Sequence, residues 1–161
     1  MKKLSNVIES VEKITSILLI AGITSILFFS VIFRYILNDP IYWASEASIF
    51  MMAWLTFLGG SLGLKYRSQA SITFLVDRLS ESKKRLMNIT THIIILISLA
   101  VLLYFSYDWI LSLSNQKSSS MRIPMWIPYL SVPVGLTFAF IHLLDHLVDF
   151  IKDKKHGGES V

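Results

Sequence analysis

The chain has 161 residues, of which 53% are hydrophobic and only 16% are charged. A soluble domain carries about 25% charged residues, so these numbers exclude a disordered chain and argue against an ordinary water-soluble enzyme. The chain contains no cysteine, which excludes a disulfide, a thiolate nucleophile and a thiolate metal site. A membrane protein remains, provided that the apolar residues are grouped into long runs.

Four long runs contain no Asp, Glu, Lys or Arg. They cover residues 14–33, 47–64, 86–107 and 123–144. Each run is about 20 residues long, and a helix of that length crosses a hydrocarbon core of about 30 Å. We therefore expect an all-α integral membrane protein with four transmembrane helices, because a span in lipid must bond its own backbone. The expected spans are about 14–36, 44–64, 86–110 and 124–148.

The basic residues are distributed unequally between the loops. Twelve of the fifteen Lys and Arg residues fall in the two terminal tails or in the loop between the second and third runs. The other two loops hold only Arg34, Lys117 and Arg122. Because basic loops stay in the cytoplasm, both termini are predicted to be cytoplasmic, an N-in/C-in topology. Orientation and anionic lipid explain the basic loop, so no nucleic-acid partner is expected.

Two stretches on this predicted cytoplasmic side have the pattern of short interfacial amphipathic helices. Residues 1–13 place apolar side chains on one helical stripe with Lys and Glu opposite, which predicts an interfacial helix or an extension of the first span. Residues 72–79 repeat the pattern and predict a short helix on the lipid surface. We expect a single membrane domain over residues 14–150, followed by a cytoplasmic tail over 151–161.

Ionisable side chains at membrane depth are costly and are kept for function, and none of the four runs has a charged residue near its middle. Arg34 closes the first run and Glu46 opens the second, so a short hairpin places both at the outer interface. There they can anchor the chain, pair with each other, or contact another chain. A self-sufficient exporter acting as a homodimer would need a carboxylate within a span, and an enzyme would need a catalytic motif; the sequence offers neither.

Histidines leave a redox function open as the alternative. His92 and His142 are expected at similar depth, so two imidazoles could ligate a haem in a haem- or quinone-binding subunit. His142, Asp145, His146 and Asp149 also have a helical spacing that suits a metal ion. Packing and interfacial roles are the commoner fate of such histidines, and we therefore expect no cofactor and no metal.

Gly59 and Gly63 form a Gly-x-x-x-Gly pair on the second run. Small residues at this spacing let helix backbones approach closely in lipid, where apolar burial does not drive association. The pair favours either packing within the bundle or docking on another membrane protein. Trp54, in the middle of the same run, is expected to be a packing residue.

Two segments resemble the small permease subunit of tripartite ATP-independent periplasmic (TRAP) transporters. In the first hairpin the matching residues are Phe33-Arg34-Tyr35, Asn38, Trp43, Glu46, Trp54 and Phe57-Leu58-Gly59-Gly60. At the entry to the last span they are residues 120–129, SMRIPMWIPY, and then Pro133-Val134-Gly135. Length, span number and topology also fit, so the resemblance covers nearly the whole chain.

The resemblance implies a small subunit in the inner membrane of a bacterium. In this family a much larger membrane subunit carries the substrate and sodium sites and moves as an elevator. A soluble periplasmic protein delivers an organic acid such as sialic acid or a C4-dicarboxylate. The small subunit is then expected to brace the large one and to help dock the binding protein, with sodium bound in the large subunit and not here.

The resemblance also suggests which residues meet these partners. Candidates for the interface with the large subunit are Arg34, Glu46, Trp54, Gly59 and Gly63. Candidates for the periplasmic docking surface are Trp43, Lys117, Ser119 and Arg122, within or near the loop 112–122.

Overall fold

A computed structural model describes residues 2–66, 81–113 and 115–156, without the side chains of 81–86, 88 and 149–156. The helices are α1 (Lys2–Tyr35), α2 (Ala44–Lys65), α4 (Glu81–Ser112), α5 (Trp126–Tyr129) and α6 (Ser131–His156). Four segments are long and apolar enough to cross a membrane: α1, α2, Ile89–Ser112 of α4, and Trp126–Val148 across α5 and α6. The prediction of four apolar helices is confirmed, whereas the helix predicted at 72–79 lies outside the described residues.

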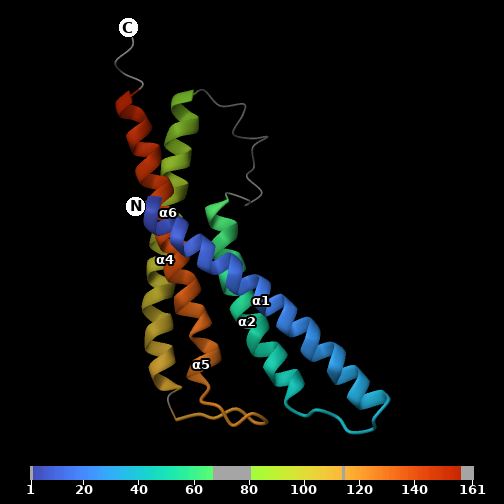
Figure 1. Cartoon of the computed structure of the whole chain (residues 1–161). Helices are drawn as coiled ribbons and strands as arrows, with labels where there is room; N and C mark the ends of the chain where they lie inside the picture. The colour runs from blue at the N-terminus through green and yellow to red at the C-terminus, as the bar shows by residue number, and fades with distance from the viewer. Residues whose placement is uncertain (1, 67–80, 114, 157–161) are drawn as a thin grey trace.

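The long helices form an elongated bundle with two distinct ends (Figure 1). The start of α1, the end of α2 and the C-terminal part of α6 lie at one end, which we call the inner end. The loops that follow α1 and α4 lie at the other, the outer end. In the packing, α6 contacts both α2 and α4, and α1 contacts α2 and, less extensively, α6. A small apolar core forms where α4 and α6 meet, around Leu99, Ala139 and Leu143.

Helix α1 is longer than the predicted first span because the amphipathic segment continues into it without a break. Its 34 residues rise about 51 Å, well beyond a hydrocarbon core of about 30 Å. The buried residues of α1 are Ser5, Ile8 and Glu12, whereas Leu4 and Val7 of the apolar stripe are exposed. Ser5 and Glu12 therefore turn into the bundle together with Ile8, while most of the apolar stripe turns outward.

The last span is interrupted near its start, between α5 and α6 at Leu130. Pro133 has no N–H to bond the carbonyl of Tyr129, four residues earlier. Beyond this point Gly135 lies against α2, because a Cβ built on it would come within 2.6 Å of Phe57 Cβ and 2.8 Å of the Phe57 carbonyl oxygen. The close crossing of α2 and α6 thus depends on a glycine that the sequence reasoning had not singled out for packing.

Candidate functional site

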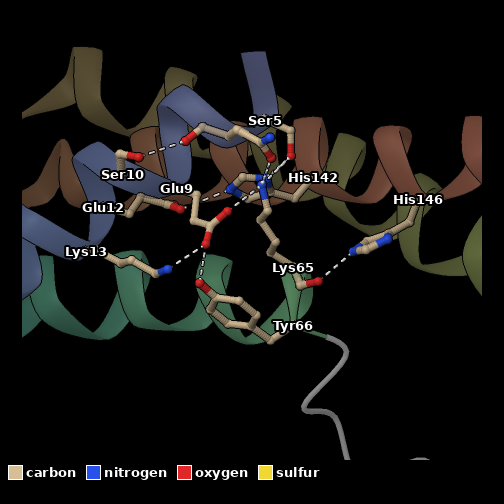
Figure 2. A network of polar contacts seen from close by, with 10 residues as sticks. Ser5, Glu9, Ser10, Glu12, Lys13, Lys65, Tyr66, His142 and His146 are labelled. Atoms are coloured by element: carbon tan, nitrogen blue, oxygen red, sulfur yellow. Dashed lines mark hydrogen bonds and ion pairs between the residues drawn. The ribbon is translucent and has the colours of Figure 1, made fainter. Parts of the chain in front are cut away.

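Polar side chains from α1, α2 and α6 meet at the inner end of the bundle (Figure 2). We call this set the inner network. Its members are Ser5, Asn6, Glu9, Glu12, Lys13, Lys65, Tyr66, His142 and His146. Helix α1 supplies five of them, α6 supplies the two histidines, and Lys65 and Tyr66 lie at the end of α2.

The centre of the inner network is a hydrogen-bonded chain through His142. Glu12 and His142 are both 0% exposed, with 3.0 Å between His142 Nε2 and Glu12 Oε2 and 2.9 Å between His142 Nδ1 and Ser5 Oγ. Lys65 Nζ lies 2.8 Å from Ser5 Oγ, and an ammonium can only donate. Ser5 Oγ and Glu12 Oε2 therefore bond the two ring nitrogens of His142 from opposite sides, and Lys65 donates to the same serine oxygen.

Lys65 and Glu9 connect this chain to the second helix. The three donors of the Lys65 ammonium reach Ser5 Oγ, Asn6 Oδ1 at 3.0 Å and Glu9 Oε2 at 2.9 Å. Glu9 Oε1 also accepts from Lys13 Nζ at 2.6 Å and from the Tyr66 hydroxyl. Two acidic and two basic side chains therefore balance one another, which lowers the penalty for holding charge beside a buried pair.

The two histidines of α6 are engaged by the protein itself. His146 Nε2 donates to the carbonyl oxygen of Lys65 at 2.6 Å and so bonds the C-terminal end of α2. Both ring nitrogens of His142 are used, so neither is free for iron, and the haem alternative with His92 is not supported. Among the described residues no cluster of three or more His, Cys, Asp or Glu could hold a metal ion; the side chain of Asp149 lies outside them.

A different polar contact organises the outer end. The Glu46 carboxylate, in the first turn of α2, accepts hydrogen bonds from three successive backbone N–H groups. Ser119 N lies 3.0 Å from Oε1, and Ser120 N and Met121 N lie 2.9 and 2.8 Å from Oε2. A carboxylate on convergent amides makes charge-assisted bonds, and the start of a helix favours its negative charge. Glu46 therefore joins the beginning of α2 to the connection between α4 and α5.

That connection, residues 115–125, is a short hairpin that we call the outer loop. Ser118 N bonds to Ile123 O at 2.9 Å and Met125 N to Gln116 O at 2.9 Å. Arg122 has a positive φ of 56°, which turns the chain back beside the three amides that meet Glu46. The proposed docking residues Lys117, Ser119 and Arg122 are exposed on this loop, and Trp43, 47% exposed, precedes α2.

The predicted interface residues of the first two spans do not gather into one site. Arg34 is exposed at the end of α1, and the Glu46 carboxylate bonds to amides of the outer loop. Trp54 and Gly63 are partly exposed on α2. Gly59 is exposed, and a Cβ built on it would meet nothing within 4 Å. Gly135 packs against α2 inside the bundle, whereas Gly59 lies on an open face.

Sequence reasoning had passed over Ser5, Glu12 and Lys65. The signal available was their position: Ser5, Ile8 and Glu12 recur at the spacing of one helical face, directly before an apolar run. An acid on such a face at a membrane boundary is expected to meet a partner from another helix. Identifying His142 as that partner required the crossing of α1 and α6.

The fold and the placement of charges at the helix ends define a multi-pass membrane protein. Residues 23–153 match the family model described as "Tripartite ATP-independent periplasmic transporters, DctQ component". This match covers most of the chain, and the protein therefore belongs to the DctQ family of small TRAP permease subunits.

Named relatives agree with this assignment. The chain is 25% identical over 153 residues to the sialic acid TRAP transporter small permease protein SiaQ of Vibrio cholerae, covering 94% of this chain and 88% of that protein. It is 24% identical over 183 residues to the C4-dicarboxylate small permease protein DctQ of the same organism, covering 94% and 77%. It is 28% identical over 145 residues to the isethionate TRAP transporter permease protein DctMQ of Oleidesulfovibrio alaskensis, covering 83% and 23%.

Proposed function

We propose that this chain is the non-catalytic small subunit of a sodium-driven, binding-protein-dependent secondary transporter for an organic acid. It braces a large elevator subunit and helps the periplasmic binding protein to dock. The subunit lies in the bacterial inner membrane with both termini in the cytoplasm, so the inner end of the bundle faces the cytoplasm.

The observation that carries this proposal is the position of the charged side chains. Residues 14–33, 47–64, 86–107 and 123–144 contain no Asp, Glu, Lys or Arg, and the ionisable groups of the inner network are engaged with one another. An ion-coupled carrier for an anion needs polar or charged groups at the substrate site, near the middle of the membrane. The groups that move sodium and substrate are then supplied by a partner.

The surface of α1 supports a large membrane partner. Only 6% of the most apolar window of α1 is buried within the subunit, against 39% for Trp126–Val148. The match to the permease protein DctMQ covers only 23% of that protein, which is consistent with a small subunit joined to a larger polypeptide. We place the large subunit against the open faces of α1 and α2, which include Gly59.

The transported substrate is an organic acid of the kinds named for the relatives. Sialic acid and a C4-dicarboxylate are the two leading candidates, from the SiaQ and DctQ relatives. The ligand specificity of the binding protein that delivers substrate to this transporter would discriminate them, because capture precedes delivery to the membrane.

Reconstitution tests the proposal directly. Proteoliposomes with this chain alone, with the large subunit alone, and with both should be compared for uptake of labelled substrate in the presence of binding protein. Uptake is expected only with both subunits and only with an inward sodium gradient. Uptake by this chain alone would overturn the proposal, and uptake that is unchanged when the sodium gradient is collapsed would remove the sodium coupling.

A further inference from the structure

The Glu46 carboxylate bonds to the outer loop mainly through three backbone N–H groups. Its two oxygens receive the N–H groups of Ser119, Ser120 and Met121 at 2.8–3.0 Å. Within the loop, Lys117 pairs with Pro124 in an isolated antiparallel bridge. The tip of this hairpin is therefore fixed to a different helix, α2, by one carboxylate.

The outer loop carries basic but no acidic residues, so its attachment to α2 also affects how positive charge is presented. Residues 115–125 include Lys117 and Arg122 and no acidic residue, and both basic side chains are exposed. Three amides on one carboxylate hold the backbone that lies between these two cations. Without the carboxylate, three successive N–H groups lose their acceptor and the hairpin samples other conformations.

We infer that Glu46 is a positioning residue for docking of the periplasmic binding protein. This inference rests on the proposed function and extends it to one residue and to the chemistry of the contact. Glu46 holds the outer loop in a single conformation, in which Lys117 and Arg122 together meet an acidic surface of the binding protein. Glu46 itself acts through the loop backbone, and its carboxylate is already occupied there.

The test uses the complete transporter, with both membrane subunits in proteoliposomes and binding protein titrated into the outer solution. Glu46→Gln keeps the shape of the side chain but replaces one acceptor oxygen by an amide that cannot accept. The concentration of binding protein for half-maximal uptake is expected to rise about tenfold, as when the docking conformer falls to about a tenth of the population. The maximal rate at saturating binding protein should stay unchanged, because transport itself is performed elsewhere.

A matched control is Asp39→Asn, which removes an exposed carboxylate from the neighbouring loop after α1. It should leave the half-maximal concentration at the wild-type value. Amide hydrogen exchange supplies the second readout: Ser119, Ser120 and Met121 should exchange faster in Glu46→Gln and at the wild-type rate in Asp39→Asn. Should Glu46→Gln fail to assemble with the large subunit, Glu46→Asp, whose carboxylate is one methylene shorter, is expected to change both readouts in the same direction.

Each outcome is decisive. Faster exchange together with a higher half-maximal concentration supports the inference. Faster exchange with an unchanged half-maximal concentration would make Glu46 a structural residue only, and a lower maximal rate at an unchanged half-maximal concentration would place its effect in transport; both overturn the inference. If wild-type uptake needs neither binding protein nor large subunit, the proposed function fails instead, and the wild-type titration shows this separately.

Discussion

The two ends of the bundle are held together in different ways. At the inner end, side chains from three helices bond to one another, and the central pair of Glu12 and His142 is completely buried. At the outer end, one side chain, Glu46, bonds to backbone N–H groups of a loop. The inner contacts depend on the identity of every partner, whereas the outer contact depends on the carboxylate alone, because every residue except proline supplies an N–H.

This difference predicts that the inner end determines the stability of the subunit, while the outer end determines its recognition of partners. A buried pair that loses one member leaves the other unpaired in a medium that solvates it poorly, so a change there affects folding. A partly exposed carboxylate that loses its donors is solvated again, so a change there affects the conformation of one loop. We therefore expect inner-end variants to alter the stability of the subunit and outer-end variants to alter the docking of the binding protein.

The largest effect is expected from a variant that disrupts the buried pair at the inner end. His142→Leu removes the partner of Glu12 Oε2, and the other oxygen, Oε1, already has no partner among the described residues. The free energy of unfolding should fall by about 3–5 kcal/mol, the range for breaking a buried pair from one side. Chemical unfolding of the subunit in mixed micelles measures it.

A double variant is the control for that prediction. Glu12→Leu combined with His142→Leu removes both polar groups, so it should recover most of the stability lost in the single variant. A double variant that is as unstable as the sum of both single variants would show that the two residues are not coupled.

The next largest effect is expected where α2 and α6 cross, between the two ends of the bundle. Gly135→Ala places a methyl group within 2.8 Å of the Phe57 carbonyl oxygen, so α2 and α6 must separate. A loss of about 1–3 kcal/mol is expected, the usual result of overpacking, again from unfolding in micelles. Gly59→Ala is the matched control, since its Cβ meets nothing within 4 Å, and an equal loss there would contradict the packing.

A smaller effect is expected from the exposed cations of the outer loop. Lys117→Glu or Arg122→Glu should weaken docking of the binding protein about fivefold at low salt, and the deficit should shrink as salt screens the charges. The measurement is the binding-protein dependence of uptake at several ionic strengths. A deficit that persists at high salt would point to lost shape complementarity, and no deficit would remove these residues from the docking surface.

The smallest effect is expected at the exposed edge of the inner network. Tyr66→Phe removes one of the three donors on Glu9, and Lys13 and Lys65 remain. Because Tyr66 is half exposed, its hydroxyl can be replaced by water, and we expect a loss of at most about 0.5 kcal/mol. A loss as large as that of His142→Leu would contradict the distinction between buried and exposed members of the inner network.

Hydrophobic length made the four spans predictable, because it is a local property of the sequence. The start of α1 was less predictable, since residues 2–13 fit either a separate interfacial helix or a continuation, and only packing against α6 decides between them. The position of Glu46 at the outer end also followed from the sequence. Its hydrogen-bond partners could not be predicted, because every residue except proline has a backbone N–H and the sequence does not mark which of them bond to the carboxylate.

The inner network shows where the sequence alone is insufficient. Glu12 and His142 are separated by 130 positions, and each had an ordinary explanation as an interfacial or packing residue. Their contact depends on the oblique course of α1 across α6 (Figure 1). Gly135 was likewise hidden, because the Gly59–Gly63 spacing is the commoner motif for close helix packing, while a single glycine has no periodic pattern.

The balance of charge within the inner network has a consequence for the membrane surface. Lys13 and Lys65 belong to the twelve basic residues that predict the orientation, yet both are paired with Glu9. The other ten basic residues of the predicted cytoplasmic segments are not paired with Glu9, and most of them lie after Lys65 in the sequence. Lipid affinity should therefore respond mainly to the basic residues within 67–85 and 152–155, while the inner network contributes little surface potential of its own.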